Sequence, residues 1–389
     1  MTSVDIAIVG AGLVGAPLAQ VLSAQGWSVA LLDAGDNASR TPASASAMTQ
    51  RCTALSLGTS QWFDAQGMWA DIAKDACAIR TVHVSHKGYF GSTRLNADEI
   101  GADAVGYVVS NDVLNSVLLK QIAHGAVQYV PNARVSRVSY QPAAVTIEYA
   151  GHAIHAKLLI AADGVSSIVR ESAGIDTQQT DYDQFAALGT VQLSRQHHNI
   201  AYERFTDSGP LALLPRPGPY MSFVDCMDPV EREAVSSMTD TCYLQRLQQR
   251  FGFRLGKFDA VGPRFMTPLL KIEATQQVAE RTVLLGNAMR LLHPVGGQGY
   301  NLALRDVAGL QRLLQGQKGA DPGDAALLET FASQRLRDQQ QVTRFTDILA
   351  RSFRGKAVIP SHMRALGLLS LDTLSPVRQQ FARRTMGIG

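Results

Sequence analysis

The sequence has few cysteines, little excess charge and no long apolar run, and each shortage excludes a class of protein. Its cysteines, Cys52, Cys77, Cys226 and Cys242, form no C-x-x-C pair, and no Cys/His cluster has zinc spacing, so we predict no bound metal. Isolated thiols of this kind are typical of a reducing compartment. The formal net charge of +3 is too small to indicate a nucleic acid as a partner.

No stretch of about 18 uninterrupted apolar residues occurs, so no membrane-spanning helix is predicted. The N-terminal residues also lack the positively charged region that opens a secretory signal. We therefore expect a cytoplasmic protein. The basic, partly apolar stretch 362–389 has two interpretations: a helix packed on the body of the protein, which we favour, or a segment in peripheral contact with a membrane.

What the sequence does contain is the composition of an ordinary globular protein, with 46% hydrophobic and 18% charged residues. A length of 389 residues exceeds the needs of one small core. It predicts two structural domains, or one domain with a large insertion.

The most informative stretch is VDIAIVGAGLVGAPLAQVLSAQGWSVALLDAG, residues 4–35. Its pattern predicts a buried strand over 5–9, a helix over 13–25 and a second buried strand over 28–33. A strand, a glycine-rich turn, a helix and a second strand in this order form the unit that binds dinucleotides in α/β proteins.

Each glycine of the G-x-G-x-x-G turn has a physical role in such a unit. Gly10 permits the tight turn, Gly12 lets a pyrophosphate approach the backbone, and Gly15 lets the helix pack closely on the strands. The start of the helix offers free N–H groups to the phosphates, and Asp33 stands where ribose hydroxyls bind. These residues predict dinucleotide binding but leave both NAD and FAD open.

Two later stretches also join a buried strand to a glycine-containing turn. In AKLLIAADGVSSIVRESAGI, residues 156–175, the strand ends at Asp163 and a helix starts near Ser166 or Ser167. In RTVLLGNAMRLLHPVGGQGYNLALRD, residues 281–306, a second strand leads into a Gly-Asn turn, and a glycine-rich loop over 294–301 precedes a helix. Several glycines in one loop lower stability, because each loses much conformational entropy on folding. A turn that only connects two elements does not need them, so we predict that this loop binds a ligand.

Together the three stretches resemble the signatures of the class A flavoprotein aromatic hydroxylases, the group of para-hydroxybenzoate hydroxylase. Those signatures are an N-terminal G-x-G-x-x-G, a central D-G, and a late G-D followed by P-x-x-G-Q-G-x-N. The resemblance covers almost the whole chain. The form GNAMRLLHPVGGQGYNLALRD is similar to the ubiquinone-biosynthesis hydroxylases, and within them to the 2-octaprenyl-6-methoxyphenol hydroxylases, where asparagine likewise replaces the usual aspartate.

The resemblance implies FAD as the cofactor. The cofactor-binding residues that it implies are Gly10, Gly12, Gly15, Asp33, Arg51, Asp163, Gly286, Asn287, Pro294, Gly297, Gln298, Gly299 and Asn301. The loop over 294–301 would line the isoalloxazine ring, and the positive end of the next helix would stabilise negative charge on the reduced ring. The residues identify no catalytic base.

Four residues are weaker candidates for contacts with a substrate: Leu213, Leu214, Pro215 and His293. The first three lie in a segment similar to the substrate-domain strand of that family, and plain sheet core is their alternative interpretation. His293 precedes the proline of the glycine-rich loop, but a lone histidine is more often a structural group.

The resemblance further implies an FAD-dependent monooxygenase that uses NAD(P)H and O2 to hydroxylate the ring of a polyprenylated phenol in ubiquinone biosynthesis. The chain has one dinucleotide fingerprint, so NAD(P)H would bind transiently in a groove, or another protein would deliver the electrons. Other ubiquinone-biosynthesis proteins are therefore expected partners. The oligomeric state is not predicted.

Other functions remain open on the residues alone. One alternative is a hydroxylase that acts at another ring position or on a soluble aromatic acid. An arginine placed to bind a carboxylate would favour the acid as the substrate. A flavin-binding assembly component with little turnover is an alternative from another class. An NAD-only dehydrogenase would leave the loop over 294–301 without a purpose.

The predicted fold is α/β, with a Rossmann-like FAD-binding domain, an inserted β-sheet substrate domain and a C-terminal helical segment. The predicted boundaries are 1–80, 106–180 and 271–334 for the FAD-binding domain, 81–105 and 181–270 for the substrate domain, and 335–389 for the helical segment. Local patterns predict a hairpin over 81–95, an Asp/Asn-capped helix within 106–125 and one helix over 231–252.

Overall fold

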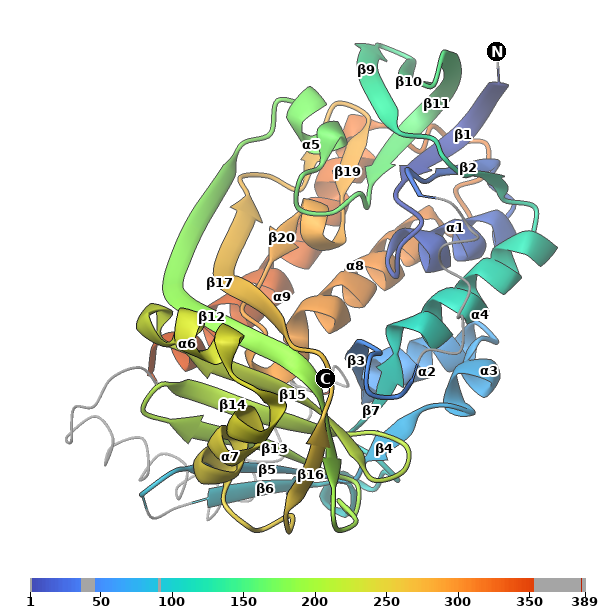
Figure 1. Cartoon of the computed structure of the whole chain (residues 1–389). Coiled ribbons are helices and arrows are strands. Elements are labelled where there is room, and N and C mark those ends of the chain that lie inside the picture. Colours follow the sequence, from blue (N-terminus) through green and yellow to red (C-terminus); the bar gives the residue numbers. More distant parts are fainter. Residues whose placement is uncertain (1, 36–45, 90–91, 353–385, 387–389) are drawn as a thin grey trace.

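The computed structural model describes residues 2–35, 46–89, 92–352 and Met386 (Figure 1). These residues form a mixed α/β structure with an eight-stranded, a nine-stranded and a three-stranded sheet. Apart from Met386, the stretch 362–389 lies outside the described residues, as does the helix predicted there. Within the described ranges, no helix is long and apolar enough to cross a membrane.

The eight-stranded sheet is built around the first two motifs. β1 (Thr2–Val9) pairs in parallel with β2 (Val29–Leu32) and with β11 (His152–Ala161). β8 (Gln128–Val130) and β19 (Thr282–Leu284) extend the parallel arrangement on the two sides. The ends of these strands are buried on both faces, which is why the sequence shows continuous apolar runs there rather than alternation.

Different elements cover the two faces of this sheet. α1 (Gly15–Ala24), α4 (Asn111–His124) and α8 (Gln298–Leu314) pack on one face. The hairpin of β9 (Val135–Gln141) and β10 (Ala144–Tyr149) curls over the other. The carboxyl ends of the parallel strands lie at one edge, where ligands bind in such sheets.

The nine-stranded sheet has the order β20-β17-β12-β15-β14-β13-β5-β6, with β16 paired to β12. The bounds are β5 (Thr81–His86), β6 (Ser92–Asn96), β12 (Thr177–Leu193), β13 (Ile200–Thr206), β14 (Gly209–Pro215), β15 (Tyr220–Met227), β16 (Phe258–Val261), β17 (Phe265–Ala274) and β20 (Arg290–Leu291). The long strands β12 and β17 run from the region of α5 (Ile168–Ser172) into this sheet (Figure 1). The hairpin predicted over 81–95 is confirmed as β5 and β6.

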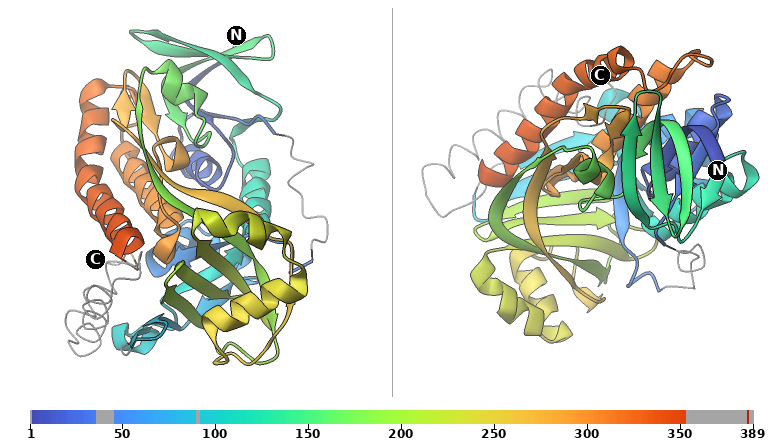
Figure 2. Two further views of the ribbon diagram at one scale, coloured as in Figure 1. Left: turned by 60° about the vertical axis from the view of Figure 1, so that its left-hand side comes forward. Right: turned by 90° about the horizontal axis from the view of Figure 1, so that it is seen from above.

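Two helices lie against one face of the nine-stranded sheet (Figure 2). They are α6 (Arg232–Ser237) and α7 (Asp240–Phe251), so the prediction of one helix over 231–252 is wrong. The break has a local cause, because the side chain of Thr239 accepts a hydrogen bond from the Cys242 amide and starts a new helix.

The remaining elements connect the two large sheets. β3 (Cys52–Ser56), β7 (Gly106–Ser110) and β4 (Cys77–Ile79) form the three-stranded sheet beside α2 (Leu57–Ala65) and α3 (Trp69–Ala73). α9 (Ala325–Ser352) packs along α8 (Figure 2). α4 is capped by the Ser110 hydroxyl, which accepts from the Val113 amide, and not by an Asp or Asn as predicted. The domain boundaries stay a prediction.

Candidate functional site

The segments around the three motifs meet at the carboxyl edge of the parallel sheet. A Cβ atom added at Gly10 would lie 2.3 Å from the carbonyl oxygen of Ala162, which directly follows β11. The hydroxyl of Tyr300, in the first turn of α8, donates a hydrogen bond of 3.1 Å to the Leu13 carbonyl. The first glycine turn therefore contacts both of the later segments, although about 150 and 290 residues separate them along the chain.

The three glycines of this turn differ in what surrounds them. Gly10 has a φ of +103°, in the region that favours glycine. A Cβ atom at Gly15 would lie 2.0 Å from the Gly10 carbonyl oxygen, so close packing requires glycine there. A Cβ atom at Gly12 would have no described atom within 4 Å. Gly12 therefore leaves space on its α-carbon side, as close approach of a pyrophosphate requires.

The start of α1 fits an anion. In the described part of the chain, no side chain caps this helix and its first turn holds no acidic residue. Its first N–H groups are therefore available to phosphate oxygens, and the helix dipole favours negative charge there. Asp33 is buried beside this turn and accepts hydrogen bonds from the amides of Ala11 at 2.6 Å and Gly35 at 2.7 Å. It ties the end of β2 to the glycine turn, and its contact with a ribose stays a prediction.

Asp163 follows the end of β11 and is largely surrounded by protein. Burial raises its pKa, and the Ser167 hydroxyl and the amides at the start of α5 partly oppose this effect. The helix starts directly after Ser167, in agreement with the predicted start near Ser166 or Ser167, and Ser167 caps it by accepting from the Arg170 amide at 3.0 Å. Both carboxylate oxygens of Asp163 are buried and have no hydrogen-bond partner among the described residues, and a contact between Asp163 and FAD stays a prediction.

The turn that follows β19 lies against the first motif. Gly286 has a φ of +58°, and a Cβ atom there would lie 3.1 Å from a methyl carbon of Val14. Its neighbour Asn287 is exposed. Arg51 immediately precedes β3, and its guanidinium lies 4.6 Å from the centre of the exposed Phe265 ring. The roles of these residues toward a flavin stay predictions.

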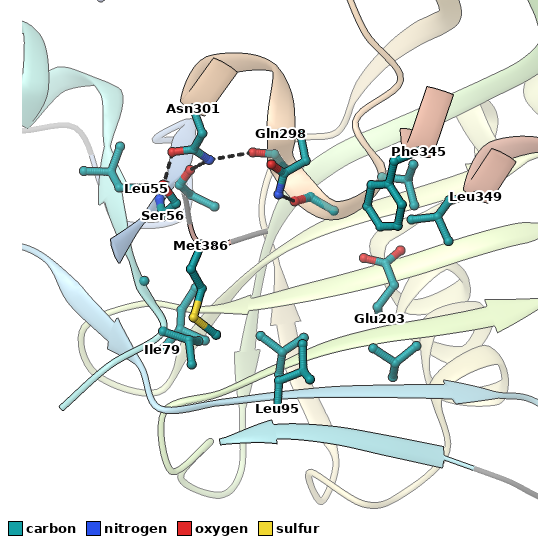
Figure 3. A pocket seen from close by; sticks show the side chains of 18 of the residues that line it. Leu55, Ser56, Ile79, Leu95, Glu203, Gln298, Asn301, Phe345, Leu349 and Met386 are labelled. Carbon is teal, nitrogen blue, oxygen red and sulfur yellow. Dashed lines mark hydrogen bonds between the residues drawn. The ribbon is translucent and has the colours of Figure 1, made fainter. Parts of the chain in front are cut away.

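The glycine-rich loop is held in place by one asparagine (Figure 3). The Asn301 side-chain amide donates to the carbonyls of Gly297 at 2.8 Å and Ala54 at 3.0 Å. Its oxygen accepts from the Ser56 amide and the Thr59 hydroxyl, each at 2.8 Å. Asn301 thus uses both donors and its acceptor to join the loop, β3 and α2.

The loop itself adopts a conformation that glycine favours. Gly296 and Gly297 have φ values of +71° and +60°. Gln298 donates to the Gly296 carbonyl at 3.0 Å, and Pro294 and Gly299 are exposed. Among the described residues, no side chain caps α8 and no acid occupies its first turn. The positive end of this helix is therefore available to the negative charge of a reduced flavin.

Replacing Asn301 with aspartate is expected to loosen this junction. Aspartate keeps the acceptor oxygen but cannot donate to the carbonyls of Gly297 and Ala54, which its second oxygen would face. We expect a loss of about 2–3 kcal/mol in the free energy of unfolding, together with weaker FAD binding. Urea unfolding and FAD titration measure the two effects. The comparable amide-to-acid change Gln245→Glu, at an exposed position of α7, should alter neither, and wild-type stability and FAD affinity in Asn301→Asp would show that these hydrogen bonds do not hold the loop.

A cavity of about 280 Å³ opens beside this loop (Figure 3). It is lined by β3, the cavity face of the nine-stranded sheet, the loop and α9. The lining residues are Ala54, Leu55, Ser56, Ile79, Val82, Val84, Thr93, Leu95, Val105, Gly106, Glu203, Phe205, Val295, Gly296, Gly297, Gln298, Asn301, Phe345, Leu349 and Met386. Most are apolar, and Glu203 is the only ionisable side chain among the described lining residues.

None of the predicted substrate residues lines this cavity. Leu213 is fully buried in the core between the sheet and α7, which favours its alternative interpretation as sheet core. Leu214 packs with the apolar cluster on the cavity side, and Pro215 is buried. His293 is buried and braces the loop, because its Nδ1 accepts from the Val295 amide at 3.1 Å. Their roles toward a substrate stay predictions.

Burial shifts the pKa values of two side chains beside the loop, His293 and Glu203. It lowers the pKa of His293 to about 4, so this imidazole is neutral at physiological pH. It raises the pKa of Glu203 to about 7, with the Gly296 amide as the opposing influence. No group of three or more His, Cys, Asp or Glu residues that could hold a metal occurs within the ranges described here. The uncapped starts of α1 and α8 are the features of this site that fit an organic cofactor with anionic parts.

Comparison with known proteins supports this assignment. The family described as the FAD binding domain matches residues 3–346. The chain is 33% identical to the ubiquinone hydroxylase UbiL of Rhodospirillum rubrum over 390 residues, covering 98% of this chain and 89% of that protein. It is 27% identical to the 3-demethoxyubiquinol 3-hydroxylase of Escherichia coli, covering 99% and 98%.

The fold is also that of a solved monooxygenase. The structure of p-nitrophenol 4-monooxygenase PnpA from Pseudomonas putida matches with a TM-score of 0.80 at 17% identity, over 99% of each chain. The anion-accepting starts of α1 and α8, the open side of Gly12 and the neighbouring apolar cavity fit a bound FAD. The chain belongs to the FAD-binding domain family, and it is an FAD-dependent monooxygenase.

Proposed function

We propose that the protein hydroxylates the aromatic ring of a polyprenylated phenol in ubiquinone biosynthesis, with NAD(P)H and O2 as cosubstrates. The observation that carries the proposal is the apolar cavity beside the loop over 294–301. Both relatives named above are hydroxylases whose names refer to ubiquinone or a ubiquinol, which supports the same pathway. When bound and reduced by NAD(P)H, FAD supplies an electrophilic oxygen atom derived from O2.

The chain's own residues would hold and shield the reacting groups. Gly12 and the start of α1 would bind the pyrophosphate, and the start of α8 would stabilise negative charge at the ring edge. Asn301 would fix the loop against β3. The apolar walls would exclude water from the oxygen transfer and would accept an apolar tail.

The lining of the cavity discriminates against a soluble aromatic acid as the substrate. Among the described residues that line it there is no arginine or lysine to bind a carboxylate, and Glu203 would repel one. A neutral phenol with an apolar tail needs no cation to bind it and is not repelled by Glu203. Peripheral contact with a membrane and with other ubiquinone-biosynthesis proteins belongs to the same proposal, because a polyprenyl tail partitions into lipid.

The experiment combines two measurements on the protein and its pathway. The released cofactor should have the spectrum of FAD, and deletion of the gene should cause a prenylated methoxyphenol to accumulate. Purified protein should then consume NAD(P)H and O2 with that compound and release a product with one more oxygen atom. Yellow protein that consumes no NAD(P)H with any prenylated phenol would favour an assembly component, and accumulation of an unrelated metabolite would contradict the pathway.

A further inference from the structure

Three side chains form one row across the floor of the cavity. Glu203 of β13 pairs with Val84 of β5, and Val84 pairs with Thr93 of β6. All three line the cavity, so they share the face of the sheet that is turned toward it. Adjacent strands lie about 4.8 Å apart, which separates Glu203 and Thr93 by roughly 10 Å with the apolar Val84 between them. A substituted phenol ring fits over a floor of that width.

Glu203 lies in a setting that disfavours a charged carboxylate. Its side chain extends into the cavity, near Phe345 and Leu349 of α9 (Figure 3). Glu203 lies deep within the protein, and the part of its side chain that stays accessible lines the cavity. In the part of the chain that the structure describes, no arginine or lysine forms an ion pair with it. An ionised carboxylate here costs folding free energy, so packing alone does not account for a glutamate at this position.

Apart from its pairing partners Val84 of β5 and Ala212 of β14, the groups near Glu203 come from three elements. The Gly296 amide belongs to the glycine-rich loop, and it favours the ionised carboxylate. The Cys226 thiol of β15 is uncharged, because burial raises its pKa well above the usual range. From α9 come the apolar Phe345 and Leu349. Glu203 is therefore the group whose charge can change within the cavity in the neutral pH range.

Thr93, at the other end of the row, has a polar atom that lacks a protein partner among the described residues. The Oγ1 atom of Thr93 is buried and has no hydrogen-bond partner among the described residues. Buried hydroxyls are normally satisfied, and an exception calls for an explanation. The two ends of the row thus offer a carboxylate and a hydroxyl to a ligand that is otherwise enclosed by apolar walls.

We propose that Glu203 is the base that accepts the proton of the phenolic hydroxyl of the bound ring. This inference rests on the proposed function. The O–H electron pair stays on the phenolic oxygen and raises the electron density at the ortho and para carbons of the ring. The proton moves to a carboxylate oxygen of Glu203, which the Gly296 amide holds beside the glycine-rich loop.

The transfer balances over one turnover. A carbon–oxygen bond forms at an activated ring carbon as the O–O bond derived from O2 breaks, the hydrogen of that carbon leaves as a proton, and the phenolic oxygen regains its proton from Glu203. Overall, one ring C–H becomes C–OH, NAD(P)H provides a hydride, solvent provides one proton, and the second oxygen atom of O2 leaves as water. Glu203 ends as the carboxylate in which it began.

The first test uses FAD-loaded protein without NAD(P)H, so that nothing turns over. The probes are a 2-methoxyphenol that carries one prenyl group and its methyl ether, which lacks the transferable proton. At pH 8 the wild type should bind the phenol about 10- to 100-fold more tightly than the ether. Glu203→Gln has the same shape without the charge and should lose this preference, whereas Glu329→Gln, at an exposed position of α9, should keep it.

The second test measures ring hydroxylation against pH. The wild-type rate should rise through about pH 7, and Glu203→Gln should be about 10²- to 10⁴-fold slower without that rise. Glu203→Asp should recover part of the rate and the pH-dependent limb, which a purely structural residue would not do. The role of Glu203 would be overturned if the wild type is active and Glu203→Gln keeps both the preference for the phenol and the pH profile. Wild type that hydroxylates no prenylated phenol would overturn the proposed function itself.

Discussion

Replacing Gly12 with alanine lowers the affinity for FAD by about 100-fold and leaves the stability of FAD-depleted protein unchanged. The physical reason is the space around this glycine: a Cβ atom there meets no described atom within 4 Å, so the fold accepts it. The same methyl group would occupy the side from which a pyrophosphate approaches the backbone. Titration of flavin fluorescence measures the affinity, and urea unfolding measures the stability.

The matched change at Gly15 should behave in the opposite way. A Cβ atom at Gly15 would lie 2.0 Å from the Gly10 carbonyl oxygen and 3.1 Å from the Ala162 side chain. Because both neighbours belong to the packed core of the sheet, Gly15→Ala should destabilise the protein itself by about 3 kcal/mol or more. If Gly12→Ala retained wild-type affinity for FAD, the pyrophosphate would not lie against this turn.

The second large effect is a gain of stability in Glu203→Gln at neutral and alkaline pH. The pKa of Glu203 rises from 4.5 to about 7 on folding, so the folded protein binds this proton more tightly than the unfolded chain does. The contribution of this group to stability therefore decreases as pH rises from about 4.5 through about 7. The rise in pKa corresponds to about 3 kcal/mol. Above that range the wild type contains a carboxylate that opposes folding.

The measurement is the free energy of unfolding of FAD-loaded protein at several pH values. Glu203→Gln should match the wild type near pH 4 and exceed it by up to about 3 kcal/mol near pH 8. Glu329→Gln controls for the loss of one negative charge from an exposed position. A constant difference between Glu203→Gln and wild type across this range would show that the Glu203 carboxyl is not held in a costly environment. If Glu203 serves catalysis, Glu203→Gln should gain stability and lose activity.

The first βαβ unit could be predicted from the sequence because its signals are local. Its strands are continuous apolar runs, its glycines stand at fixed spacing, and β1, α1 and β2 fall within two residues of most predicted ends. The predicted helix over 231–252 failed for an equally local reason. Thr239 caps a new helix in the middle of it, and a threonine inside a helical pattern does not by itself predict a break.

The cavity could not be predicted in the same way. In the strand IAYERFT, one face carries Ala201, Glu203 and Phe205, and the other carries Tyr202 and Arg204. Both faces mix polar and apolar residues, so alternation alone does not say which one turns inward. The answer depends on the pairing of β13 with β5, which comes from a segment more than 110 residues earlier in the chain. The sequence did not lead us to Glu203, and the signal that could have done so is a charged residue between the two apolar neighbours Ala201 and Phe205 on one face.

The predicted substrate residues illustrate the same limit. Leu213 and Leu214 are neighbours in sequence, yet one is buried toward α7 and the other packs on the cavity side. Successive residues of a strand point to opposite faces, so a run such as LALLP cannot wall a single site as a block. The resemblance named a strand of the nine-stranded sheet, but no residue of that strand, β14, is among the described residues that line the cavity.

We expect segments distant in the chain to hold one FAD together, beside the apolar cavity. The decisive measurement is a crystal structure of the FAD-loaded protein. It should place the pyrophosphate against Gly12 and the start of α1, and the isoalloxazine ring against residues 294–301 with its other face toward Glu203. Flavin density away from these segments, or purified protein that is colourless and cannot be reconstituted with FAD, would contradict it.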